Sequence, residues 1–188
     1  PRINVSAANE HVRPVEQRIR VVKECCRATH HSLPFSQITT FMTISMVLFN
    51  GRMLNNFPSK GGVSDRFSPR MLLTGENLDA KRDLPLEFCS YCQVHENDEP
   101  RNTMVARTQA ALSMGPSGNK QGGQNFMSLR TGLKLVRFSW DELPMPDTVV
   151  GRVRQLAKGQ PELLSFKDRK GRLIGNDVEL PGLDGADP

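Results

Sequence analysis

The spacing of apolar residues near the start of the chain predicts an amphipathic helix. From about Arg13 or Pro14 to Ala28, apolar side chains recur every three or four residues, which is the period of one helical face. The following residues, which include two histidines and Pro34, are expected to break this helix. Its apolar stripe consists of Val15, Ile19, Val22 and Cys26.

A second helix is predicted from residues 36–57, SQITTFMTISMVLFNGRMLNNF. Its apolar residues cover most of the helical surface, which is typical of a helix in a protein core. Phe57 and Pro58 are expected to end it. Two such helices need a third surface to pack on, and we expect this surface to be a β-sheet outside the chain.

The period of the pattern changes after residue 84. Apolar and polar residues alternate through residues 86–94, and three later segments also have strand character. Turn-rich segments join them, so three to five short strands are expected in a small antiparallel barrel or sandwich. A short helix over residues 146–158 and a hairpin around Lys170 follow.

The composition is that of a globular protein. The chain has 188 residues, of which 37% are apolar, and its mean hydropathy is −0.44, as expected for one or two soluble domains. No apolar run approaches the roughly 20 residues of a bilayer span, and no signal peptide is recognisable, so we expect an intracellular protein. Because the chain opens with Pro1 and ends in PGLDGADP, we also expect a fragment of a longer polypeptide.

Charge is distributed in blocks along the sequence. Residues 1–75 hold ten Lys and Arg against four Asp and Glu, and residues 104–140 hold five against none. Residues 76–103, with three cations and seven anions, separate these basic blocks. Such blocks are typical of proteins that bind nucleic-acid phosphates. Ordinary solvated faces are the alternative interpretation.

One carboxylate and three cations share an edge of the first predicted helix. Glu16 stands next to the apolar stripe, and Arg20, Lys23 and Arg27 follow it at helical spacing. One interpretation is a metal-ligating carboxylate above cations that track a DNA backbone, since phosphoryl transfer from nucleic acid commonly uses divalent metals held by carboxylates. The alternative is a surface helix on which Glu16 and Arg20 form a weak ion pair.

The run NEHVRPVEQRIRVVKE resembles the last catalytic-core segment of integrases from copia-type LTR retrotransposons. In that family a strand end leads into a helix with an early glutamate, which basic residues follow. Glu16 holds the place of the glutamate, and Gln17 stands where the family usually has arginine. The resemblance covers about residues 3–177, is closest to elements of diatoms and related algae, and includes LPFSQI, MLNNFPSKGGVSDRFSPRMLLTG, LEFCSYCQVH, RTQAALSMGPSGNKQGGQNFMSLRTG and SWDELPMP.

The resemblance implies that residues 1–60 are the C-terminal helices of an RNase H-like integrase core. The active site of such a core has three carboxylates, so Glu16 would be catalytic and would share Mg²⁺ or Mn²⁺ with two upstream aspartates. Only 15 residues precede Glu16 and none is aspartate, so the chain alone is not expected to hold the metal pair. The cations of this helix that are expected to contact DNA are Arg18, Arg20, Lys23 and Arg27.

Residues 85–146 resemble the SH3-like domain that lies between integrase core and reverse transcriptase in such polyproteins. Residues 61–84 are then a linker, and residues 147–188 are a short helix and a linker toward reverse transcriptase. The expected fold class is α+β, with core helices, an SH3-like antiparallel β-barrel and a partly disordered tail. The cations of the barrel either contact DNA or only keep it soluble. They are Arg107, Lys120, Arg130, Lys134 and Arg137.

The cysteines provide a zinc hypothesis. Cys89 and Cys92 form a C-x-x-C pair, with His95 nearby. A strand through residues 88–95 would point the two thiols to opposite faces, and no second pair of this kind exists in the sequence. Free thiols in a reducing compartment are therefore the preferred interpretation.

The resemblance implies a fragment of a retrotransposon integrase, which takes part in DNA integration by metal-dependent strand transfer. Expected partners are element and target DNA and the remaining polyprotein domains, with self-association left open and no membrane. The expected location is the nucleus or a cytoplasmic particle. The alternatives are a catalytically inactive remnant that only binds DNA or protein and, less favoured, a zinc-bound adaptor.

Overall fold

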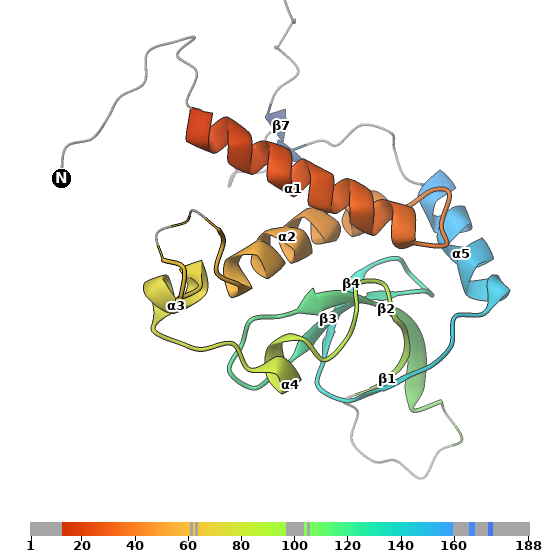
Figure 1. Cartoon of the computed structure of the whole chain (residues 1–188). Helices are drawn as coiled ribbons and strands as arrows, with labels where there is room; N and C mark the ends of the chain where they lie inside the picture. Colours follow the sequence, from red (N-terminus) through yellow and green to blue (C-terminus); the bar gives the residue numbers. More distant parts are fainter. Residues whose placement is uncertain are drawn as a thin grey trace, which may run out of the picture.

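The computed structural model describes residues 13–60, 62, 64–96, 104, 106–159, 166–167 and 173–174. Two long helices precede a five-stranded antiparallel sheet and a third long helix follows it, which confirms the predicted α+β class (Figure 1). The strand end expected near Val5 and the acidic tail lie outside the described residues. None of the helices in the described part is long and apolar enough to cross a bilayer.

Both predicted N-terminal helices are present. Helix α1 spans Arg13–Ser32, so it begins where the pattern predicted but continues past Ala28. Histidine does not bar the helical conformation, whereas the residue before Pro34 is sterically disfavoured in it, so the helix ends just before that proline. Helix α2 spans Thr40–Asn56; the Thr39 hydroxyl caps it by accepting the Met42 N–H at 3.2 Å.

The connector between helices and sheet is more ordered than the predicted linker. Helix α3, Pro69–Thr74, has Ser68 as its N-cap and proline in its first turn, and helix α4, Ala80–Asp83, has Asp79 as its N-cap. A serine or aspartate cap, with proline at the first helical position in α3, is a recognised helix start. These signals were present in the sequence, and the linker prediction overlooked them.

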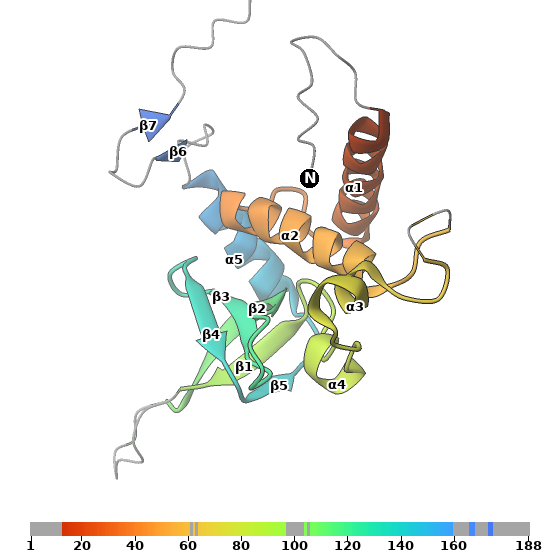
Figure 2. The same cartoon turned by 90° about the vertical axis from the view of Figure 1, so that its left-hand side faces the viewer.

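The five strands form an open antiparallel sheet. Strands β1 to β4 pair consecutively and β5 pairs with β1, which gives the order β4-β3-β2-β1-β5, so the barrel expected from the sequence does not close. Strands β4 and β5 lie at opposite edges of the sheet, although only two residues separate them in the sequence. The sheet must therefore curl to bring these edges near each other, but no backbone hydrogen bonds pair β4 with β5 (Figure 2). The strands are β1 Tyr91–His95, β2 Thr108–Pro116, β3 Gln124–Ser128, β4 Lys134–Arg137 and β5 Trp140–Glu142.

The first strand begins later than the alternating pattern predicted. Cys89 has a φ of 65°, a left-handed conformation that interrupts an extended chain, so β1 starts at Tyr91 rather than near residue 86. The C-terminal elements agree with the sequence. Helix α5 spans Asp147–Lys158, and β6 (Phe166–Lys167) pairs antiparallel with β7 (Leu173–Ile174), which confirms the predicted hairpin.

Helix α2 packs on the sheet of this same chain, so the prediction that its supporting sheet lies outside the chain is wrong. Figures 1 and 2 show α2 between α1 and the sheet. Met42 of α2 is fully buried in one core with Leu112 of β2 and Met127 of β3. Val149 and Val153 of α5 are buried in this helix-side core, and Val150 packs against it.

A second core lies on the other face of the curled sheet. Phe126 is its largest residue and is fully buried, and its ring centroid lies 5.7 Å from that of Trp140. Cys89 belongs to the helix-side core and Cys92 to this second core. The two thiols therefore face different cores, as the alternation argument expected, although Cys89 lies outside the strand.

Candidate nucleic-acid interface

The apolar stripe of α1 is open along its N-terminal half. Val15 is 54% exposed and Ile19 is 49% exposed, although both belong to the stripe that the sequence marks as buried. Together with Val22 and Cys26 and with Val47 of α2, they form the floor of an apolar groove of about 810 Å³. Within the described residues, nothing covers this groove.

Helix α2 contacts α1 mainly through the later turns of α1, which explains the open half. Asn50 of α2 is the polar centre of this contact: its Nδ2 donates to Cys26 Sγ at 3.8 Å, and its Oδ1 lies 3.1 Å from Thr29 Oγ1. Burial raises the pKa of the Cys26 thiol, so the thiol stays neutral. The first turns of α1 extend beyond this contact (Figure 1).

The predicted DNA-binding cations of α1 border the groove. Lys23 and Arg27 line it on one side and Arg18 on the other, and all three are exposed. Helix geometry places Glu16 and Arg20 on the same edge as Lys23. Glu16 is exposed too.

Two cations of α1 already have polar partners. Arg27 forms an exposed ion pair with Glu24 at 2.5 Å, an i,i+3 contact on the same helix. Arg18 donates from Nη2 to Ser59 Oγ at 3.2 Å. Exposed contacts of this kind contribute little stability, so a phosphate can displace them at small cost.

The strand register divides the sheet cations between two ends of the sheet. Met127 pairs with Lys134, and Gln124 pairs with Arg137, so β4 carries one cation at each end. The β3–β4 turn, with Arg130, and the start of β2, preceded by Arg107, lie at the Lys134 end. The β2–β3 loop, which carries Lys120, lies at the Arg137 end.

A further arginine, which sequence reasoning missed, supports the turn at the Lys134 end. Arg152 of α5 donates to the Leu129 carbonyl and to the Arg130 carbonyl, both at 2.8 Å. It thereby fixes the turn that presents Arg130. At the other end, Lys120 lies 3.6 Å from Glu76 in an exposed ion pair. Nothing in the sequence spacing indicated either pairing.

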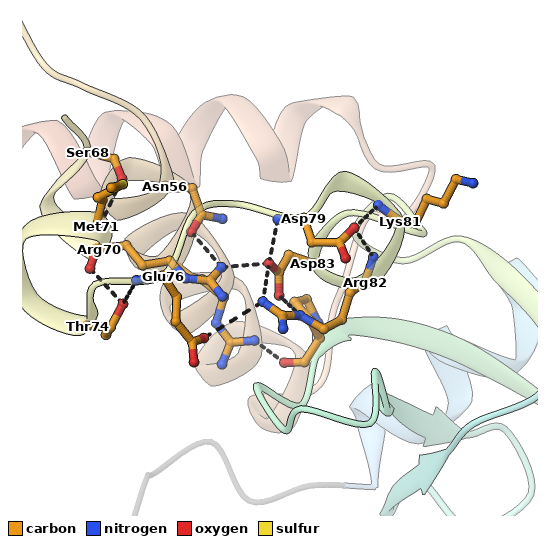
Figure 3. Close-up of polar contacts among 12 residues, drawn as sticks. Asn56, Ser68, Arg70, Met71, Thr74, Glu76, Asp79, Lys81, Arg82 and Asp83 are labelled. Atoms are coloured by element: carbon orange, nitrogen blue, oxygen red, sulfur yellow. Dashed lines mark hydrogen bonds and ion pairs between the residues drawn. The ribbon is translucent and has the colours of Figure 1, made fainter. Parts of the chain in front are cut away.

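Among the residues that the structure describes, Asp83 carries the most buried charge, and it lies at the centre of a polar cluster (Figure 3). Its Oδ2 accepts from Arg70 Nη1 at 2.8 Å and Arg82 Nη2 at 3.1 Å, and from the Asp79 N–H at 3.1 Å. Burial alone would raise the pKa of Asp83, but the hydrogen bonds from Arg82, Asp79 and Arg70 outweigh it and lower the pKa to about 2. This cluster ties α3 to α4, so its role is structural.

The described residues do not fit a divalent metal. They contain no group of three or more His, Cys, Asp or Glu side chains that could hold an ion, and Glu16 is the one predicted ligand. Burial also raises the pKa of Cys89, and burial with nearby Glu142 and Asp141 raises the pKa of Cys92 to about 12. The two thiols also face different cores, so they do not converge on one ion.

Comparison with family models, with curated proteins and with solved structures gives no match for this chain. Function therefore has to be inferred from the site. The arrangement combines an open apolar groove, a ladder of cations along one edge of it, and two cationic ends of a small sheet. Such an arrangement can bind a polyanion at its cations and a protein surface in its groove.

Proposed function

We propose that this chain is part of a copia-type retrotransposon integrase and that its cations bind the DNA backbone. The observation that carries this proposal is the open stripe of α1 beside Glu16 and the cation ladder. A helix with an uncovered apolar face needs a further surface. In the proposed protein, the sheet of the RNase H-like core is that surface.

Packing of the RNase H-like sheet on α1 would make Glu16 a metal ligand of the active site. Glu16 lies at the border of the groove, so a sheet docked there would bring its strand-end aspartates toward this carboxylate. Mg²⁺ or Mn²⁺, held by the three carboxylates, would supply the chemistry of strand transfer. This chain contributes one of those ligands, and the cations that follow Glu16 hold the DNA.

The sheet supports the second part of the proposal. An antiparallel sheet in which β1 to β4 pair consecutively and β5 pairs with β1 is compatible with an SH3-like domain. We assign its cations to non-specific DNA contact, because the register spreads them over both ends of the sheet. Element and target DNA and the other polyprotein domains are the proposed partners, in the nucleus or a cytoplasmic particle.

The second candidate function is a module that binds DNA or protein and catalyses no reaction, since the described residues alone form no metal site. The reading frame that precedes this chain in its gene discriminates between the two. Two aspartate codons at predicted strand ends, in an uninterrupted frame, support the integrase. A frame broken by stop codons supports the binding module.

The DNA-binding part is tested with two double variants of equal charge. Arg20→Ala with Lys23→Ala is expected to weaken binding of a short random-sequence duplex about tenfold, because two phosphate contacts are lost. The control is Arg154→Ala with Lys158→Ala on α5, where both side chains are also exposed. Fluorescence anisotropy of labelled duplex measures both affinities. An equal loss in the two variants would show an effect of net charge and would contradict the assignment to α1.

A further inference from the structure

Strand β4 is an edge of the sheet, and its outer side has no strand partner within the described part of the chain. The Ser128 N–H donates to the Leu133 carbonyl at 2.9 Å, which fixes the alternation of hydrogen bonds along the β3–β4 ladder. Lys134 and Val136 therefore direct their N–H and C=O groups away from β3. The guanidinium of Arg137 donates to the outward Val136 carbonyl at 3.0 Å.

Helix α2 overhangs this edge with apolar side chains. Leu48 is 68% exposed and Ile44 is 42% exposed, and both line a hollow of about 110 Å³ between α2 and β4. This volume is several times the roughly 30 Å³ share of a liquid water molecule, so the hollow can take a side chain. A strand added to β4 would place alternate side chains against Leu48 and Ile44.

Polar groups in the hollow favour an acidic occupant. Lys134 and the half-buried Arg52 line it, and no carboxylate does. The guanidinium of Arg52 donates to the Pro116 carbonyl, and burial together with the nearby Arg70 lowers the pKa of Arg52.

The same charges disfavour pairing of two β4 edges. In an antiparallel pair of β4 strands from two copies, the outward-facing residues pair with each other, so the register centred on Lys134 places the two Lys134 side chains directly opposite one another. Like charges directly opposite are destabilising in a sheet, and lysine on an edge strand is a known defence against such pairing. The charge of the edge therefore selects a partner strand that carries acids.

We propose that the β4 edge binds an extended acidic peptide of a partner protein by strand addition. The backbone of the peptide pairs with Lys134 and Val136. An apolar side chain of the peptide enters the hollow beside Leu48, and carboxylates on the same face of the peptide lie against Lys134, which lines this hollow. Main-chain hydrogen bonds supply affinity in this mode of recognition, and side-chain pockets supply specificity. This site is independent of the DNA-binding role of α1.

The probe is the fluorescein-labelled peptide Thr-Glu-Thr-Val-Thr-Glu, with Thr-Lys-Thr-Val-Thr-Lys as its charge-reversed control, so that the valine and the charged side chains share one face of the strand. The full chain is expected to bind the acidic peptide and not the basic one. Val136→Pro removes an outward N–H and leaves the β3 ladder intact, since proline is tolerated on the solvent side of an edge strand. It is expected to weaken peptide binding at least tenfold, as measured by fluorescence anisotropy.

A second pair of variants decides the question if Val136→Pro does not fold. Leu48→Glu places a repelling charge at the hollow and is expected to weaken binding about tenfold, whereas Leu73→Glu on α3, where the residue is 85% exposed, is expected to leave it unchanged.

The proposal is overturned if both peptides bind alike, or if Val136→Pro and Leu48→Glu bind like the wild type. Displacement by duplex DNA without any effect of Val136→Pro would assign the peptide to the basic surface. Self-association that Val136→Pro abolishes would make a second copy the occupant, and either result also overturns the proposal.

Discussion

Replacing Met42 with alanine is expected to lower the free energy of unfolding by about 3 kcal/mol, within the range for buried methionine truncations. Met42 is fully buried between α2 and the sheet, where Leu112 and Met127 surround it. The Thr39 hydroxyl lies 3.5 Å from Met127 Sδ and also caps α2, so the helix start is fixed against the sheet. The truncation leaves a cavity that this fixed contact cannot close.

Urea unfolding measures this effect with two probes. The single tryptophan, Trp140, reports on the sheet, and far-UV circular dichroism reports on the helices. Both transitions are expected to shift together, because α2 and the sheet share one core. The control is Ile19→Ala on the open stripe, which is expected to cost less than about 1 kcal/mol since Ile19 is half exposed. A helix transition that shifts while the Trp140 transition stays in place would contradict the shared core.

Asp83→Asn is expected to cost about 2 kcal/mol at neutral pH. The pKa of Asp83 falls from 3.8 to about 2 in the folded chain, and each unit corresponds to roughly 1.4 kcal/mol. The side chain is only 7% exposed and Arg70 only 20%, so solvent screens their ion pair weakly. The neutral amide leaves Arg70 without its anion and leaves Arg82 with only the more distant Glu76, at 4.0 Å.

The same variant has a defined pH dependence. Because the folded pKa lies below the unfolded one, the stabilisation by Asp83 is complete above about pH 5 and is lost as the pH falls toward 2. Urea unfolding of the wild type and of Asp83→Asn should therefore differ at pH 7 and converge near pH 2. The control is Glu24→Gln, which removes the exposed pair with Arg27 and should cost less than about 0.5 kcal/mol. A difference that stays constant across this range would contradict the role of the charge.

Local pattern was sufficient to predict the long helices and the strand content. The start of α1, the end of α2 at Phe57 and the position of α5 follow from helical periodicity and breakers. The pattern could not show what each apolar face contacts. Met42 and Leu112 are 70 residues apart in the chain, and periodicity carries no information on such a long-range contact.

The open sheet has a similar explanation. The order of the strands in the sheet depends on the strand with which β5 pairs. Strand β5 pairs with β1, at Cys92 and Val94. The alternation of residues is the same in an open sheet and in a closed barrel. The left-handed residue Cys89 was also unpredictable, because residues other than glycine rarely adopt this conformation.

The residues of the candidate site could be predicted from the sequence, but the shape of the surface around them could not. Helical spacing was enough to place Glu16, Arg20 and Lys23 on one edge of α1. The open groove beside them depends on where α2 crosses α1, and at this crossing Asn50 of α2 contacts Cys26 and Thr29 of α1. The hollow beneath Leu48 likewise depends on tertiary packing.

The salt dependence of DNA affinity for the full chain tests the proposed DNA-binding role most directly. The logarithm of the binding constant should fall linearly with the logarithm of salt concentration, by about 0.9 for each phosphate neutralised. The cations of α1 and of the two sheet ends predict a slope of about −3 or steeper, reduced by about 2 in the Arg20 and Lys23 double variant. An affinity that stays the same from low to high salt, or a slope that the double variant leaves unchanged, would contradict the proposal.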